Sequence, residues 1–151
     1  MSTPGYVDPR GPRAGAVITS VVLAAVLVTG WGWLLAAQAA VFAVGAANLR
    51  RSPYSLLYRR VVAPRLAPPQ ELEATAPPQF AQLVGCALAV IGAAGYLGGA
   101  QWLGVLMTAA ALAAALLNAA FGICLGCEMH LLLARALRRP SGPRFVPARP
   151  R

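Results

Sequence analysis

The sequence predicts an all-α protein, a four-helix transmembrane bundle made of two hairpins, with further helices at the cytoplasmic interface. Apolar side chains make up 58% of the chain and charged ones 11%, whereas a soluble domain is about 45–50% apolar and about 25% charged. No charged residue occurs in residues 14–49 or 74–127. Glycines and tryptophans divide each of these two runs near its middle. A disordered chain is excluded, because the apolar surface available for burial is large.

The first uncharged run, residues 14–49, fits two membrane spans. A helix rises about 1.5 Å per residue and the hydrocarbon core is about 30 Å thick, so one span takes roughly 20 residues. The segment Gly30-Trp31-Gly32-Trp33 lies at the midpoint, where glycines permit a turn and tryptophans anchor at the headgroups. We expect spans at about 14–29 and 33–49. Apolar sequence continues directly after the first span, which disfavours a cleaved signal peptide.

The second uncharged run gives the second pair of spans. It opens with Pro77-Pro78 and is interrupted at Gly98-Gly99, which predicts spans at about 80–97 and 102–121. Between the pairs lies a cytoplasmic loop, 50–79, in which Ser52-Pro53 favours the start of a short amphipathic helix. An interfacial helix is expected at about 124–139, which completes a membrane domain of residues 14–139. The flanking segments 1–13 and 140–151, rich in Pro, Gly and Arg, are expected to be disordered basic tails.

The arginines predict the orientation. Two precede the first span, five lie in the central loop and six follow the last span, so neither hairpin turn carries any. The positive-inside rule then places both termini and the central loop in the cytoplasm. The net charge of +9 does not indicate nucleic-acid binding, because the arginines are divided among three membrane flanks.

The segment Cys124-Leu125-Gly126-Cys127 is the candidate for chemistry. One helix over residues 102–139 would be about 57 Å long, nearly twice the hydrocarbon thickness, so we expect a bend at 122–126 and a new helix from about Cys124. A helix N-terminus favours a thiolate and lowers the pKa of a thiol. The two thiols are one turn apart, which suits Cys124 as the attacking thiol and Cys127 as the resolving one. Redox or sulfur transfer, metal binding and incidental cysteines all remain open.

Four other residues are possible supporting groups. Glu128 either caps the first helical turn or assists the thiols, and His130 is either a base, a third metal ligand or an interfacial side chain. Cys86 lies roughly 9 Å from the inner end of its span. It is either a third thiol that reaches the pair or a buried apolar residue. Asn118, together with Asn48 and Gln82, indicates a small polar vestibule on the cysteine side, because polar side chains within spans hydrogen-bond between helices.

We expect no cofactor and no metal. His130 lies about 240° around an ideal helix from Cys124, so one straight helix cannot aim both cysteines and the histidine at one ion. Dithiol exchange needs no such convergence. The reduced, purified protein is therefore expected to carry less than about half an equivalent of zinc, iron or copper.

Three segments carry a family resemblance. They begin at Asn118 (NAAFGICLGCEMH), Leu49 (LRRSPY) and Pro77 (PPQFAQ). The chain resembles, over about residues 12–137, an uncharacterised actinobacterial family of small four-helix membrane proteins known as domain of unknown function 4395. Members are often encoded beside thioredoxin-like proteins and sulfurtransferases, which implies thiol or sulfur metabolism in a bacterial plasma membrane. Cys124, Cys127, Glu128 and Met129 match the family's motif, whereas an aromatic residue is expected where this chain has His130.

The leading functional hypothesis is a membrane thiol–disulfide or sulfur-relay protein that exchanges with a soluble thioredoxin-like or sulfurtransferase partner. The second is a transport or channel subunit for a small sulfur species, and the third is a structural subunit without chemistry. No charged residue lies within a predicted span, which argues against a proton-coupled pump. The expected partners are thus the lipid bilayer and this soluble protein, nucleic acid is not expected, and the sequence leaves the oligomeric state open.

Overall fold

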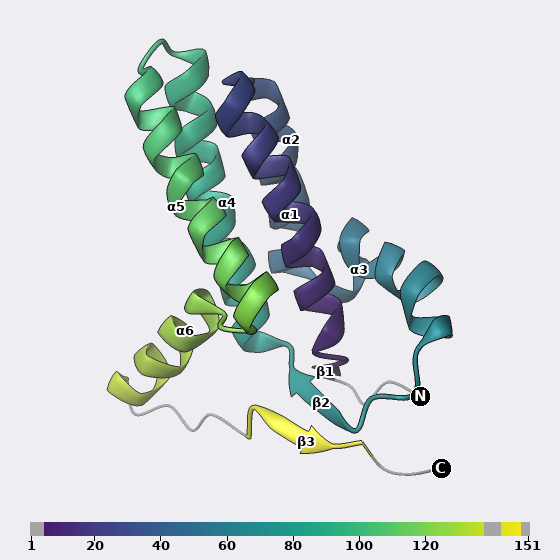
Figure 1. Ribbon diagram of the computed structural model, residues 1–151. Coiled ribbons are helices and arrows are strands. Elements are labelled where there is room, and N and C mark those ends of the chain that lie inside the picture. The colour runs from purple at the N-terminus through teal and green to yellow at the C-terminus, as the bar shows by residue number, and fades with distance from the viewer. Residues whose placement is uncertain (1–4, 138–142, 149–151) are drawn as a thin grey trace.

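The computed structural model describes residues 5–137 and 143–148. In Figure 1 the long helices lie side by side, with short strands and helices gathered at one end. The described residues form four long helices, namely α1 (Arg10–Thr29), α2 (Gly32–Ala47), α4 (Ala76–Leu97) and α5 (Gln101–Phe121). Each expected span falls on one of these helices, and their ends differ by four residues or fewer.

Glycine allows both long-helix turns. Helix α1 ends at Gly30, whose φ is +67° and whose N–H donates to the Val26 carbonyl at 2.7 Å. In the turn from α4 to α5, Gly99 has φ +85°. Residues with a side chain rarely adopt this left-handed region, so glycine is favoured at both positions. Trp31 and Trp102 beside the turns are 58% and 70% exposed, as expected for anchors at a membrane surface.

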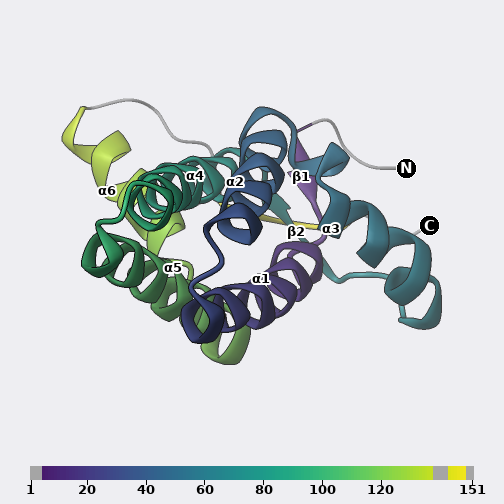
Figure 2. The ribbon, with the colours of Figure 1, turned by 90° about the horizontal axis from the view of Figure 1, so that it is seen from above.

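The four helices form a ring in which α2 packs mainly against α4 and α1 mainly against α5 (Figure 2). Helices α4 and α5 also pack closely, since a Cβ at Gly104 would stand 2.6 Å from the Tyr96 ring. By contrast α1 and α2 touch little, so each helix of the first expected hairpin packs mainly against a helix of the second. The core between the helices consists of Leu23, Val26, Leu35, Ala39, Phe42, Ala89, Ala93, Tyr96 and Ala111.

Among the described residues, three helices, α1, α4 and α5, are long and apolar enough to cross a membrane. Helix α2 is apolar but has 16 residues, and at about 1.5 Å per residue it is shorter than the hydrocarbon thickness of about 30 Å. The protein is thus mainly helical with three membrane-length helices, and a four-span bundle goes beyond this finding.

A small sheet corrects the expectation of an all-α fold with two disordered tails. Strands β1 (Tyr6–Val7), β2 (Glu71–Ala74) and β3 (Phe145–Pro147) form one antiparallel sheet in the order β1-β2-β3. In the middle strand, Glu73 pairs with Val7 on one side and with Phe145 on the other. Parts of both predicted tails are therefore ordered, because they add strands to the loop strand β2 at the same end of the bundle. The remaining tail residues, 1–4, 140–142 and 149–151, lie outside the described part.

The central loop carries the predicted helix start at Pro53. After the 3₁₀ turn Leu49–Arg51 comes α3 (Pro53–Leu57), followed by a π-helical turn, Tyr58–Val62, and a second 3₁₀ turn, Ala63–Arg65. Two phenols tie this segment to the bundle, as the Tyr54 hydroxyl donates to Gln38 at 2.6 Å and the Tyr58 hydroxyl to Asp8 at 2.9 Å. Helix α6 (Leu125–Ala136) completes the fold, packed against α4.

Candidate disulfide site at the start of α6

The chain bends where the sequence predicted a bend. Helix α5 ends at Gly122, which has φ +70° and donates its N–H to the Asn118 carbonyl. Helix α6 begins three residues later. The start of α1 meets this bend, since the Arg13 guanidinium donates to the Ala120 carbonyl at 3.4 Å. The bend therefore lies at the end of the bundle that also holds the sheet.

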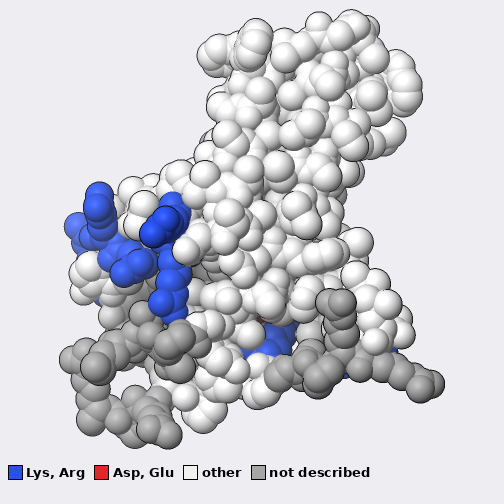
Figure 3. Space-filling view, turned by 180° about the vertical axis from the view of Figure 1, so that it is seen from behind, with Lys and Arg blue, Asp and Glu red and all other residues white. Residues whose placement is uncertain are grey.

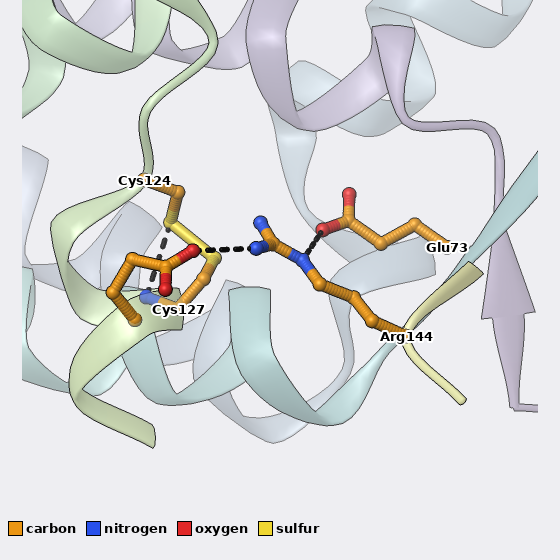
Figure 4. A network of polar contacts seen from close by, with 5 residues as sticks. Glu73, Cys124, Cys127 and Arg144 are labelled. Carbon is orange, nitrogen blue, oxygen red and sulfur yellow. Dashed lines mark hydrogen bonds and ion pairs between the residues drawn. A yellow bond between two sulfur atoms is a disulfide. The ribbon is translucent and has the colours of Figure 1, made fainter. Parts of the chain in front are cut away.

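Cys124 and Cys127 form a disulfide across the first turn of α6, with their Cα atoms 5.2 Å apart (Figure 4). Cys124 is the N-cap residue of α6, and its Sγ accepts a hydrogen bond from the Cys127 N–H at 3.3 Å. Cys127 is 2% exposed, whereas Cys124 is partly exposed. The two sulfurs thus differ in access: a reagent from outside meets Cys124 first.

Gly126, between the cysteines, sets the position of α6. A Cβ on this buried residue would stand 2.5 Å from the Ala81 Cα and 2.6 Å from the Ala81 Cβ of α4. Two carbon atoms in van der Waals contact are about 3.5–4.0 Å apart, so glycine is the residue that lets the two helices approach this closely. Sequence reasoning treated Gly126 as part of the bend and missed this packing role.

Arg144 connects two acidic side chains beside the disulfide (Figure 4). Its Nε donates to Glu73 at 3.0 Å, and its terminal nitrogen donates to Glu128 of α6 at 2.7 Å. Glu73 is buried, with its side chain 8% exposed, so the arginine compensates a charge that is largely removed from water. Glu128 lies in the first turn of α6, as expected, and the pairing with Arg144 links that turn to the sheet. Sequence reasoning missed both Arg144 and Glu73, because their pairing depends on a strand in a segment expected to be disordered.

The structure does not bring the other two candidates to the sulfur atoms. The Cys86 thiol donates to the Ala39 carbonyl of α2 at 3.5 Å, and this cysteine packs against the core. The His130 ring lies against Phe80, with ring centroids 5.6 Å apart. Its Nδ1 is buried and has no hydrogen-bond partner among the described residues.

A cavity of about 480 Å³ adjoins the disulfide and is lined by Cys124, Cys127, Asn118 and Gln82. Two of the three residues expected in a polar vestibule therefore share it. Asn48 does not line it, and its side chain accepts a hydrogen bond from the Arg50 N–H at 3.1 Å. Further lining comes from Arg10, Arg13, Ala16, Thr19, Phe42, Glu73, Ala81, Leu88, Ala110, Ala111, Ala114 and Arg144.

Within residues 5–137 and 143–148, no group of three or more His, Cys, Asp or Glu side chains is arranged to hold a metal ion. The chemical groups that the site does offer are a disulfide at a helix N-terminus, an arginine bridged to two carboxylates and an adjacent cavity.

These features define a small helical protein with membrane-length helices and a Cys-x-x-Cys pair at the end of its bundle. The chain belongs to the family described as Domain of unknown function (DUF4395), whose family model matches residues 7–135. The match includes both cysteines and all four long helices. No curated protein and no solved structure matches the chain.

Proposed function

We propose that the protein is an integral membrane protein with four spans, both termini in the cytoplasm, and that it resides in a bacterial plasma membrane. The charge distribution supports this orientation. On the face shown in Figure 3, the arginines lie toward one end of the molecule and the other end is free of them. Both hairpin turns, at Gly30 and Gly99, lie at the end opposite the sheet in Figure 1. In this proposal α2 is the fourth span, and the exposed side chains of Trp31, its N-cap residue, and Trp33, in its first turn, reach the headgroups at one end.

We further propose that the pair Cys124 and Cys127 performs thiol–disulfide exchange with a soluble thioredoxin-like or sulfurtransferase partner. The observation that carries this proposal is the unequal access of the two sulfurs at the N-terminus of α6. A partly exposed first cysteine suits contact with a partner, and a buried second cysteine suits internal resolution. The helix N-terminus stabilises the thiolate that leaves or attacks.

The bonds and electrons of the proposed exchange balance when the partner supplies two thiols. One partner thiolate attacks the Cys124 Sγ, the Cys124–Cys127 bond breaks, and its electron pair leaves on Cys127 as a thiolate. The second partner thiolate then attacks the partner's own sulfur in the mixed disulfide and releases the Cys124 thiolate. Two electrons pass to the pair, and the partner ends as a disulfide. The reverse sequence, which begins with attack by the Cys124 thiolate on a partner disulfide, oxidises the pair.

Neighbouring residues have positioning roles in this proposal. Glu128 fixes the first turn of α6 to the sheet through Arg144, which holds the disulfide beside the cavity. Asn118 lines the approach to the sulfurs. Cys86 takes no part, since its thiol faces α2.

Single-cysteine variants test the exchange. Each of the three cysteines is kept alone, with the other two changed to Ser, in full-length protein in detergent. The probe is a thioredoxin-like protein whose one remaining cysteine carries thionitrobenzoate, and the coloured thiol released by attack is followed over time.

We expect the Cys124-only variant to react at least about tenfold faster than the Cys127-only and Cys86-only variants, because thiolate character and access both favour Cys124. Equal rates for the three variants, or a faster Cys127, would contradict the proposed roles. Denaturing each variant before the reaction is the control, since access differences then disappear.

A further inference from the structure

The cavity beside the disulfide reaches well into the bundle. Along α4 its lining runs from Pro78 to Leu88, which is about 15 Å at about 1.5 Å per residue. Two buried residues of α1 and α5 also line it: Ala16 lies six residues after the start of α1, and Ala111 lies ten residues before the end of α5. The cavity therefore connects the disulfide with the apolar interior of the helix ring.

Polarity changes along this cavity. At the disulfide end its lining includes charged and amide side chains, namely Arg10, Arg13, Glu73, Gln82, Asn118 and Arg144. Farther in, the lining is mainly Ala with Val84, Gly85, Leu88 and Phe42, and Thr19 is the polar exception. A matching ligand has a polar head at the sulfurs and an apolar body directed into the bundle.

The volume of the cavity limits which ligands fit. A volume of about 480 Å³ lies within the range of about 300–1,000 Å³ typical of sites for medium-sized organic molecules. A folded protein partner cannot enter it, and a sulfite-sized anion would leave most of the apolar lining without contacts. The proposed dithiol exchange also needs an oxidant for the reduced pair, and a ligand of this cavity that fills that role accepts two electrons. Lipid-soluble quinones combine these properties: an apolar chain, a ring with two carbonyl oxygens and two-electron chemistry.

We propose that this cavity binds a lipid-soluble quinone, with the ring beside Cys124 and the chain along the α5 alanines, and that the quinone reoxidises the reduced pair. This inference rests on the proposed dithiol exchange. The Asn118 amide and the Arg13 guanidinium supply donors for the ring oxygens. Arg13 is available for this, because among the described residues it pairs with no carboxylate and makes a 3.4 Å contact to the Ala120 carbonyl.

The oxidation balances without a further reagent. The Cys124 thiolate adds to a ring carbon, an S–C bond forms, and the ring takes the electron pair. The Cys127 thiolate then attacks the Cys124 Sγ, the S–S bond forms, the S–C bond breaks, and its electron pair stays on the ring. Two electrons and the two thiol protons pass to the quinone, which leaves as a hydroquinone.

The test uses reduced full-length protein in detergent with decylubiquinone, whose ring carbons are all substituted, so that permanent arylation is avoided. Loss of the ultraviolet absorbance of the oxidised ring and formation of the Cys124–Cys127 disulfide are followed together. The cavity variant is Ala114→Phe, and the matched control is Ala113→Phe, since Ala113 is exposed on the same helix and does not line the cavity.

We expect the wild type to reduce one quinone per disulfide formed. Ala114→Phe is expected to slow this reaction about tenfold or more, equivalent to about 1.4 kcal/mol, whereas Ala113→Phe stays close to the wild type. Exchange with the thionitrobenzoate-activated protein should be unchanged in both, which shows that the variants are folded. An azidoquinone photolabel on unmodified protein should mark the cavity-facing parts of α4 and α5.

Two kinds of failure are distinguishable. If exchange with the activated protein is normal but quinone is reduced no faster than by a free Cys-x-x-Cys peptide, or equally fast in Ala114→Phe, the quinone inference is wrong and the dithiol proposal stands. Photolabelling confined to the outer surface also overturns the inference. If the exchange itself is absent in the wild type, the proposed function fails first.

Discussion

Replacing Gly126 by Ala tests the packing that positions the disulfide. The new Cβ would stand 2.5 Å from the Ala81 Cα, about 1 Å or more inside ordinary contact, and the obstacle is backbone that cannot rotate away. Overpacking of this kind costs about 1–3 kcal/mol. The helix propensity of Ala offsets little of this, because Gly126 lies in the first turn of α6.

The cost should appear as exposure of Cys127. If α6 must separate from α4 before this buried thiol reacts, a cost of about 1–3 kcal/mol raises the population of the open state roughly 5- to 150-fold. The assay is alkylation of Cys127 in the Cys124→Ser background, with unfolding in detergent measured in parallel. Gly15→Ala is the matched control, because its Cβ would meet Tyr54 at an ordinary 3.6 Å. A Gly126→Ala protein with wild-type stability and wild-type Cys127 reactivity would refute the reasoning.

Three other predictions concern the ion pairs, a phenol and the topology. Arg144→Gln leaves buried Glu73 without its cation and is expected to lower the free energy of unfolding by about 2–3 kcal/mol, measured by denaturant titration; no loss would contradict the bridge. Burial, reinforced by a hydrogen bond to the Asp8 carboxylate, raises the pKa of Tyr58 from 10.0 to about 12. The neutral phenol therefore stabilises the fold fully below pH 10.0, and this contribution is lost as the pH rises to about 12. Ultraviolet titration should show one phenol ionising near pH 12 that Tyr58→Phe removes, and an unchanged curve would refute this. Reporter fusions should give a periplasmic signal at Trp31 and a cytoplasmic signal at Ala67, and a periplasmic signal at Ala67 would overturn the topology.

The long helices were predictable because their signals are local. Uncharged runs, the turn glycines Gly30 and Gly99 and the helix start at Pro53 each act within a few residues, so the observed ends lie close to the expected ones. The proximity of Cys124 and Cys127 was predictable for the same reason, as one helical turn separates them.

The sheet and its ion pairs were not predictable, because their signals are not local. Strands of two to four residues are too short to show a period of two along the chain. The Arg144–Glu73 contact joins residues 71 positions apart, and the arginine lies in a segment whose composition is typical of a disordered tail. Likewise, the close approach at Gly126 depends on Ala81 in another helix, which no pattern within the Cys-x-x-Cys segment reveals.

The central position of β2 in the sheet imposes an order on assembly during synthesis. Its β1 neighbour is already made when β2 leaves the ribosome, but β3 comes after α4, α5 and α6 have been made. Until β3 is made, one edge of strand β2 is unpaired. Arg144, the ion-pair partner of Glu128, is synthesised 16 residues after it. The cysteines are therefore translated before the strand that fastens their helix to the sheet. During synthesis there is therefore a stage in which both cysteines exist and α6 can pack on α4 and α5 but has no arginine of the C-terminal segment to pair with Glu128.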